Sequence, residues 1–534
     1  MTKVCSFENA VSVIESGQTV ACVGVICWVT PDGTLAALAR RFRETGSPRD
    51  LFFYFPCGTG DAQRIKGMDH IAIPGLLRRI VSGSYINPVD PQTGKRPELM
   101  RIIREELVEA YSWPIGATRH WLREVARRSP GYMTKVGLNT YIDPRQTGGK
   151  LNKRTTADLV ELVNFRGEEY LFYPTFPVNV GLIRATAADE LGNLSFEDEP
   201  IMSSSAAIAL AVKACGGRVI AQVRKIVPRF SRPAHTVRVP GVLVDHVVVD
   251  PQQMMVTEIP FDESFLGGKW APLERLPRLP LSADKVVARR VAREIPRDTV
   301  CVFGFGASSD APSVMVEDGI ITQESIHRYP FTTEHGPFGG IVMSGWTFSA
   351  NINPEALLDN VTQFDFIDGG NAKFAALAFA QFDAAGNVNV SRFGNAHPGA
   401  GGFADIAHNA QKLAFAGTFT TGGLKVAIGD GTIKVLEEGK VCKFVNKAEQ
   451  ITYPIVEGIT RRGQQAVVIT ERAVFRVEPD GLVLTEAAKG IDVRSQILEK
   501  MEFAPVRIQE PLGVMEAALF AGAPATPTRA AQMQ

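Results

Sequence analysis

Two distant segments of this chain share one pattern, and this repetition constrains the fold more than any other feature. Residues 19–25 (TVACVGV) and 299–305 (TVCVFGF) are apolar, β-branched runs that end in a glycine turn. A short apolar run bounded by turn residues is typical of a strand that is buried on both faces of a sheet. Each run follows a helical segment and a short polar turn. The repetition therefore predicts two halves with similar cores.

A second pair of matching segments supports the duplication and measures its asymmetry. Residues 189–194 (DELGNL) and 383–388 (DAAGNV) both read Asp-x-x-Gly-Asn after an apolar run. The two apolar runs start 280 positions apart (19 and 299), whereas the two Asp-x-x-Gly-Asn segments start 194 positions apart (189 and 383). The first half therefore has 86 more residues between its apolar run and its Asp-x-x-Gly-Asn segment. We expect the surplus to include a helix over 97–111 and loops near 113–116 and 141–151.

The boundary between the halves is predicted from composition. Residues 264–281 (SFLGGKWAPLERLPRLPL) are rich in Pro, Gly and Leu and have no sustained period, which indicates an ordered linker. Ser282 is placed to cap a helix whose apolar face continues to Ile295 before Pro296 ends the pattern. We predict an N-terminal domain over 1–263, with an insertion at about 62–150, and a linker over 264–281. A C-terminal domain over 282–520 and a flexible tail over 521–534 follow.

The alternation of strands and helices predicts the fold class. It indicates α/β layers with largely parallel sheets. We therefore predict two homologous open α/β domains that are fused in one chain. Ligands of such sheets bind at the carboxyl ends of the strands, so the site is expected between the two halves.

Charge and composition exclude several classes of function. The 57 Lys and Arg residues balance 57 Asp and Glu residues, which gives no support for binding to nucleic acid or a membrane. No apolar run approaches the roughly 18 residues of a membrane span, and the N-terminus has no signal pattern. Seven scattered cysteines form no CxxC, so we expect no metal site and a cytoplasmic, reducing compartment. His397 and His408 are predicted to be polar supports.

A carboxylate at a predicted strand end is the first candidate for chemistry. In residues 331–340 (FTTEHGPFGG), Glu334 stands where a β-branched run gives way to glycines, as at a strand that opens into a tight turn. An ionised carboxylate that is exposed at a concave edge can attack an activated acyl group. The alternative is a surface glutamate beside a turn. The competing Glu324 lies in a polar stretch and is predicted to be solvated.

Two glycine-rich turns are candidates for supplying backbone N–H donors. Gly304 and Gly306 follow the predicted strand of the second half, where a bare strand-to-helix turn is the alternative. Gly401 and Gly402 precede a helix-like run, so their N–H groups are placed to hold an oxyanion. For this loop the alternative is a flexible segment that is capped by the helix.

Together these features resemble family I coenzyme A transferases of the single-chain acetate/propionate type, over nearly the whole chain. The resemblance rests on the glutamate and glycines of 331–340, on the loop over 399–406 (GAGGFADI) and on the fused repeat. Further supporting segments are 137–145, 165–174, 353–355, 363–370 and 386–391.

The resemblance implies a role for individual residues. Glu334 matches the glutamate that becomes a glutamyl-CoA thioester. Gly402 matches a position whose N–H helps to stabilise the oxyanion, with Gly401 beside it. Gly304 and Gly306 match a turn near which CoA is held.

The resemblance also implies the reaction. This is a ping-pong exchange of CoA between a short-chain acyl-CoA and a free carboxylate such as acetate, propionate or butyrate. CoA is a substrate, no cofactor is required, and the protein is a homotetramer or homodimer. Two other functions stay open: an acyl-CoA hydrolase on the same scaffold, in which water intercepts the thioester, and a non-catalytic or sugar-isomerase-like protein.

Some positions depart from the family pattern. Ala307 and Ser308 stand where Met-Pro is usual, and His335 follows the glutamate where a small residue or Asn is usual. These changes bear on acyl specificity, CoA contact and hydrolysis. The surplus of the first half is predicted to shape the acyl pocket, with Tyr111 and Trp113 as a wall that limits acyl length. The alternative is that both residues pack against the helix that starts near 97.

Overall fold

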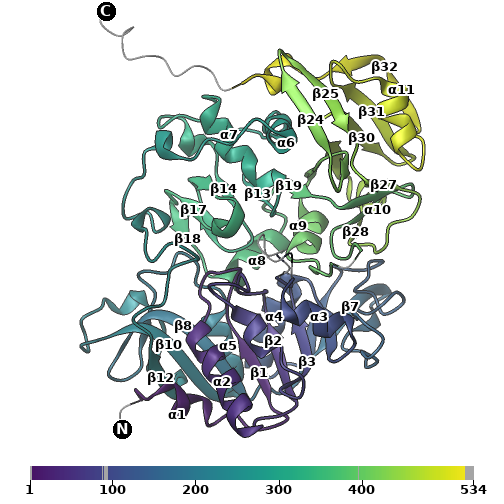
Figure 1. The fold of residues 1–534 in the computed structure, drawn as a ribbon. Coiled ribbons are helices and arrows are strands. Elements are labelled where there is room, and N and C mark those ends of the chain that lie inside the picture. The colour runs from purple at the N-terminus through teal and green to yellow at the C-terminus, as the bar shows by residue number, and fades with distance from the viewer. Residues whose placement is uncertain (1–2, 87, 89–93, 95, 395, 523–534) are drawn as a thin grey trace, which may run out of the picture.

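The computed structural model describes residues 3–86, 88, 94, 96–394 and 396–522. Each half contains one large sheet, and the first half lies below the second in Figure 1. Three helices lie where the halves meet: α4 (Ile115–Arg127) from the first half, and α8 (Asn360–Asp368) and α9 (Phe403–Asn409) from the second. The predicted tail falls mostly outside the described residues.

The sheet of the first half has a parallel centre. Its strands are β1 (Thr19–Cys22), β2 (Leu51–Phe55), β3 (Leu77–Ser82), β4 (Glu109–Ser112), β8 (Val180–Asp189), β9 (Leu194–Ser195), β10 (Arg218–Val227), β11 (Val237–Val239) and β12 (His246–Val249). The parallel strands run in the order β4-β3-β2-β1-β8-β10-β12. Strands β9 and β11 are antiparallel additions beside β8.

The sheet of the second half repeats this centre. Its strands are β13 (Cys301–Phe303), β14 (Phe331–Thr332), β15 (Pro337–Phe338), β18 (Ala356–Leu357), β19 (Phe374–Ala378), β22 (Lys412–Ala416), β29 (Gln465–Ile469), β30 (Ala473–Glu478), β31 (Gly481–Ala487) and β32 (Arg507–Val514). The parallel order β14-β13-β19-β22-β29 matches β2-β1-β8-β10-β12 strand for strand.

The remaining elements cover the sheets or form small sheets of their own. The other helices are α1 (Phe7–Val11), α2 (Asp32–Thr45), α3 (Glu98–Arg104), α5 (Ser205–Ala214), α6 (Ala283–Ala292), α7 (Ala311–Glu317), α10 (Ile455–Arg462) and α11 (Val493–Gln496). The small sheets contain β5 (Gly131–Thr134), β6 (Glu161–Phe165), β7 (Glu168–Pro174), β16 (Ile341–Val342), β17 (Asn351–Ile352), β20 (Gln381–Asp383), β21 (Asn387–Asn389), β23 (Thr420–Thr421), β24 (Lys425–Gly429), β25 (Thr432–Glu437), β26 (Val441–Cys442), β27 (Phe444–Val445) and β28 (Tyr453–Pro454). Among the described residues, no helix combines the length and apolar character that crossing a membrane requires.

The predicted fold class, two similar α/β halves in one chain, is confirmed. The two Asp-x-x-Gly-Asn turns even share their hydrogen bonds. Asp189 accepts from the backbone N–H groups of residues 191 and 193 and from the side chain of Asn193. Asp383 does the same with residues 385 and 387 and with the side chain of Asn387.

Two sequence predictions about helices have different outcomes. The Ser282 cap is confirmed, because its side chain accepts from Lys285 N, although α6 ends at Ala292. The predicted helix over 97–111 is wrong beyond α3. Residues 109–112 pair with β3 as strand β4, and Val81 lies opposite Tyr111. One short 3₁₀ helix, Glu263–Phe265, begins just before the predicted linker, and a second, Leu273–Arg275, lies inside it. The exact domain limits stay predictions.

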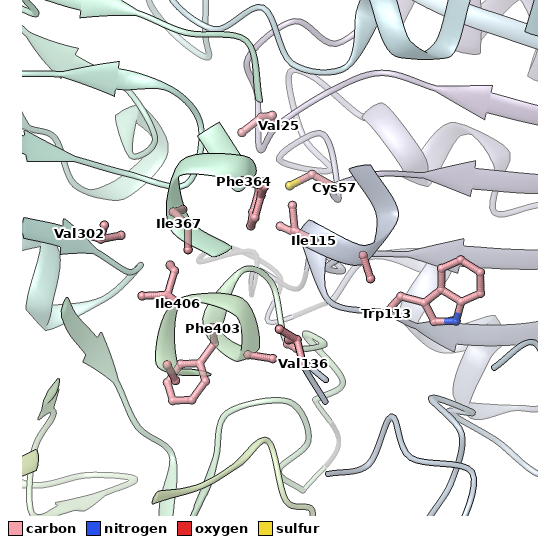
Figure 2. Packing of buried hydrophobic residues seen from close by; sticks show 14 of the residues in the cluster. Val25, Cys57, Trp113, Ile115, Val136, Val302, Phe364, Ile367, Phe403 and Ile406 are labelled. Atoms are coloured by element: carbon pink, nitrogen blue, oxygen red, sulfur yellow. The ribbon is translucent and has the colours of Figure 1, made fainter. Parts of the chain in front are cut away.

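One apolar core continues across the junction of the halves. In Figure 2, Cys57 and Ile115 of the first half face Phe364 of α8, with Ile406 and Phe403 of α9 nearby. All five residues belong to a single buried cluster. Because burial of apolar area is the main stabilising force, this shared core holds the carboxyl ends of the second sheet against the first half.

Candidate active site between the two halves

Glu334 lies in the turn that joins two antiparallel strands. Thr332 of β14 is opposite Phe338 of β15, so residues 333–336 form the connection. Gly336 has a φ of 105°, and an added Cβ would collide with the Leu358 carbonyl oxygen. Only glycine fits that position, which fixes the path of the chain next to Glu334. The predicted strand end and glycine turn are confirmed.

The expectation that Glu334 is exposed is wrong. The residue is 8% exposed, because the glycine loop of the second half covers it. An added Cβ on Gly402 would lie 2.7 Å from Glu334 Oε2 and 2.9 Å from its Cδ. The carboxylate therefore sits directly against the backbone of Gly402. By contrast Glu324, the competing carboxylate, is exposed and accepts a hydrogen bond from Thr322.

Helix α8 holds the turn that carries Glu334. Gln363 donates to the Thr333 carbonyl oxygen at 2.7 Å, and Asn360 lies 2.7 Å from His335 Nδ1 through its Nδ2 atom. His335 Nε2 in turn lies 3.3 Å from Glu334 Oε1. Asn360 therefore orients the imidazole, and the imidazole orients the carboxylate.

His335 is buried, and its surroundings act on its protonation in opposite directions. Burial lowers the pKa of His335, but Cys57 and Glu334 outweigh burial and raise it above its usual value. The Asn360 Oδ1 atom has no partner in the described part of the chain. Rotation of that amide would let Oδ1 accept from a protonated Nδ1, so Asn360 can serve both protonation states of His335.

The loop that carries Gly401 and Gly402 is clamped by the first half. Gly401 donates to the Gly83 carbonyl oxygen at 3.0 Å and accepts from Ile115 N at 2.9 Å. Ala400 N donates to the Tyr141 hydroxyl at 3.1 Å. Gly402 then caps α9, and its N–H donates no hydrogen bond within the described residues. That N–H is therefore free to donate to a ligand.

Gly304 and Gly306 lie at the same edge of the sheet. Strand β13 pairs with β14 in parallel, with Val302 opposite Thr332, so the turn after β13 begins beside the turn that holds Glu334. Gly306 has a φ of 114°, which requires glycine. Ser308, one of the departures from the family pattern, donates to the Gly304 carbonyl oxygen at 3.0 Å. This hydroxyl stabilises the turn locally.

Two residues near Glu334 were not predicted from the sequence. Cys57 is buried, and its sulfur lies 3.4 Å from the Ser84 hydroxyl. Burial raises the pKa of its thiol, but His335 and Arg119 outweigh burial and lower it below the usual value. Arg119 of α4 is fully buried. Neither residue belongs to a local motif, because tertiary packing alone brings them to the site.

Asp405 joins the first half to the helix that follows Gly402. Gly116 N of α4 donates to Asp405 Oδ2 at 3.1 Å, and a Cβ at Gly116 would collide with the same carboxyl group. Burial, together with the charges of Asp368 and Glu334, raises the pKa of Asp405 well above its usual value. The contact between α4 and α9 thus fixes the position of the glycine loop.

Tyr111 and Trp113 are packing residues, contrary to the predicted wall of an acyl pocket. Trp113 is fully buried and packs edge-on against Tyr54, Trp121 and Tyr173. Tyr111 is also buried, and its hydroxyl donates to the Ala157 carbonyl oxygen. Both residues therefore pack in the first half, but in a different buried cluster from Leu99 and Ile103 of α3, so the alternative is right about packing and wrong about the partner helix.

Replacing Trp113 with alanine is therefore expected to destabilise the protein. Loss of a buried aromatic side chain of this size typically costs about 3–5 kcal/mol. The measurement is the shift of the denaturant midpoint, with Phe165→Ala as the control because Phe165 is half exposed. A changed preference for longer acyl-CoAs with unchanged stability would instead support the pocket wall.

His408 of α9 is expected to make stability depend on pH. The pKa of His408 is lowered from 6.5 to about 4, mainly by burial and to a smaller extent by the charges of Arg462 and Lys135. Between pH 6.5 and pH 4, His408 binds a proton in the unfolded chain but not in the folded chain. The free energy of unfolding therefore decreases as the pH falls from 6.5 towards 4.

His408→Asn is expected to remove this loss of unfolding free energy, which amounts to at most about 3 kcal/mol between the two ends of the range. Thermal unfolding of both proteins between pH 4 and pH 7 measures the difference. Exchange of the exposed His327 for Asn serves as the control. A profile for His408→Asn that is parallel to that of the unaltered protein would contradict the assignment.

Comparison with known proteins places this geometry in a family. The sequence profile of the coenzyme A transferase family matches residues 4–250. Caffeate CoA-transferase of Acetobacterium woodii is 38% identical over 528 residues, which is 97% of this chain and 98% of the relative. Acetate CoA-transferase YdiF of Escherichia coli K12 is 37% identical over 519 residues, which is 97% of this chain and 95% of the relative.

A solved structure shows the same arrangement over the whole chain. The acyl-CoA transferase YdiF of Escherichia coli O157:H7, determined as a thioester complex with CoA, superposes with a TM-score of 0.88 at 35% sequence identity. The match covers 98% of this chain and 96% of that one. This chain belongs to the coenzyme A transferase family, and it is a single-chain CoA-transferase.

Proposed function

We propose that the protein moves CoA from a short-chain acyl-CoA to a free carboxylate through a thioester on Glu334. The observation that carries this proposal is the packing of the Glu334 carboxylate against the backbone of Gly402, at the junction of the two halves. A nucleophile and an N–H donor that face the same small volume are the elements that acyl transfer requires.

The proposed reaction has two matching halves. Glu334 attacks the thioester carbonyl carbon, the C–S bond breaks, and an acyl-glutamyl anhydride and a CoA thiolate result. The thiolate then attacks the glutamyl carbonyl carbon, which releases the first carboxylate and leaves a Glu334–CoA thioester. A second carboxylate attacks that thioester, and the same steps in reverse release the new acyl-CoA. The energy of the thioester is kept throughout.

Each attack passes through a tetrahedral oxyanion, for which Gly402 is the proposed donor. Its Cα faces the carboxylate, and the hydrogen bonds of Gly401 to the first half hold the loop in place. A donor that is already in position needs no reorganisation when the charge develops. Gly304 and Gly306, at the neighbouring strand end, are proposed to border the entry of CoA.

The proposed acyl group is short and linear: acetate, propionate or butyrate. The support is the resemblance to acetate/propionate transferases and the similarity to an acetate CoA-transferase. A relative named for caffeate is similar to the same degree, so an aromatic acid belongs in the assay. The burial of Glu334 supports transfer over hydrolysis, because bulk water has little access to the thioester.

The remaining expectations are also proposals. Because no step consumes ATP or needs a Lewis acid, we propose that activity requires no metal or bound cofactor, and that EDTA leaves it unchanged. A cytoplasmic location is supported by the seven cysteines, all of them unpaired thiols. A homodimer or homotetramer is supported by the family resemblance, and sedimentation equilibrium measures it.

The exchange reaction itself is tested with acetyl-CoA in the presence and absence of propionate. The proposal predicts propionyl-CoA and acetate only when propionate is present, with parallel double-reciprocal plots. Release of free CoA at the same rate without propionate would indicate the hydrolase instead. Absence of both reactions with acetate, propionate, butyrate and caffeate as acceptors would contradict the proposal.

A further inference from the structure

Arg119 is unlike every other buried arginine in the described part of the chain. The guanidinium groups of four buried arginines each contact a carboxylate within 3.0 Å: Arg184 with Glu199, Arg289 with Asp318, Arg290 with Glu486 and Arg472 with Glu471. No carboxylate of the described residues lies within ion-pair distance of Arg119, although its side chain is fully buried. A buried charge of this kind is costly unless an anion pairs with it.

The guanidinium of Arg119 is also only partly hydrogen bonded. Its Nη1 atom donates to the Ser204 hydroxyl and, at 3.3 Å, to the Ser203 hydroxyl. Its Nε and Nη2 atoms donate to no atom of the described residues. These two atoms form one edge of the guanidinium fork, which is the edge that binds both oxygens of a carboxylate.

Contacts on two sides connect Arg119 to the surroundings of the nucleophile. On one side, the neighbouring Thr118 donates to the carbonyl oxygen of Pro56, the residue before Cys57. On the other side, the Ser203 carbonyl oxygen accepts from Asn360 N, and Asn360 contacts the imidazole that lies against Glu334. Arg119 thus closes a chain of contacts that leads through Ser203, Asn360 and His335 to the nucleophile.

The charge of Arg119 persists at neutral pH and acts on this site. Burial lowers the pKa of Arg119 to about 10, while the charges of Cys57 and Glu334 raise it. The guanidinium is therefore protonated under the conditions of the reaction. It supplies a fixed positive charge from the first half to a nucleophile that belongs to the second half.

We propose that the free Nε–Nη2 edge of Arg119 binds the carboxylate group of the free acid substrate. This inference rests on the proposed function, since it assigns a recognition residue to the acid that leaves in the first half-reaction and attacks in the second. A monocarboxylic acyl-CoA carries no free carboxylate at its acyl group. Arg119 therefore discriminates between the two substrates, and its loss weakens binding of the acid far more than binding of the thioester.

The test measures the KM of each substrate separately, with acetyl-CoA as donor and propionate as acceptor. Arg119→Met removes the charge at similar volume, and Arg119→Lys keeps the charge but loses the fork. Arg123→Met is the matched control, because Arg123 lies one turn further along α4 and pairs at the surface with Asp365. Arg119→Met is expected to raise the KM of propionate about ten- to a hundredfold and to change that of acetyl-CoA less than about threefold.

We expect the lowest propionate KM for the unaltered protein and Arg123→Met. Arg119→Lys is expected to have an intermediate value and Arg119→Met the highest. An Arg119→Met protein that transfers CoA with an unchanged propionate KM, or with both KM values raised equally, overturns the inference while the proposed function stands.

A second measurement does not depend on turnover. Propionate is expected to raise the thermal midpoint of the unaltered protein and of Arg123→Met, but not that of Arg119→Met. If the unaltered protein shows this shift without any transfer, the proposed function fails and the binding site stands. The inference is overturned if propionate shifts the midpoints of the unaltered protein and of Arg119→Met equally, or if it shifts neither midpoint.

Discussion

Replacing Glu334 with glutamine is expected to lower CoA transfer by more than about a thousandfold while the fold persists. The amide has nearly the same size and keeps contact with Gly402 and His335, but it cannot form the anhydride. Transfer between acetyl-CoA and propionate measures the loss, and thermal unfolding checks the fold.

Glu324→Gln is the matched control, because Glu324 is the exposed carboxylate that competes with Glu334 in the same stretch of sequence. It is expected to retain full activity. Substantial transfer by Glu334→Gln, or an equal loss in Glu324→Gln, would remove Glu334 from the proposed mechanism.

Replacing Gly402 with alanine is expected to lower transfer about a hundred- to a thousandfold, comparable to the loss of one oxyanion donor. The backbone at Gly402 (φ −86°, ψ 3°) accepts an alanine, so the effect does not arise from local strain. Instead the new methyl group would lie 2.7 Å from Glu334 Oε2 and displace the carboxylate from the N–H donor. Steady-state kcat with saturating acetyl-CoA measures this effect.

Gly401→Ala separates this steric effect from a general disturbance of the loop. Gly401 has open space around its Cα but a φ of 59°, so alanine there costs about 1–2 kcal/mol of backbone strain and leaves Glu334 unobstructed. We expect it to reduce stability more than Gly402→Ala does and to reduce kcat less. The reverse order would show that loop rigidity, rather than the space beside Glu334, governs the rate.

Features that depend on neighbouring residues in the sequence were predicted well. The turn at Glu334 follows from β-branched residues that give way to glycines, and the cap at Ser282 follows from its position before an apolar period. The two Asp-x-x-Gly-Asn turns are each satisfied by their own side chains. Their repetition sufficed to predict two halves with one topology, because the same local pattern selects the same strand-turn unit.

Features that depend on docking of the two halves were missed. Glu334 was expected to be exposed, but Gly402, 68 positions further along (334 to 402), covers it. Tyr111 and Trp113 have the composition of a pocket wall, and only the packing around them shows that they belong to a core. Arg119 lies in an ordinary amphipathic helix. Its isolation from the carboxylates of the described residues becomes visible only when α4, α5 and α8 are brought together.

Capture of the covalent intermediate tests the central claim most directly. The protein is incubated with acetyl-CoA without an acceptor, separated from free nucleotide, reduced with borohydride and digested for mass spectrometry. The account predicts reduction of one carboxyl group, in the peptide that contains residues 331–340, and no reduction in Glu334→Gln. A modified Glu324, Asp405 or Cys57, or unmodified protein that still transfers CoA, would contradict the account.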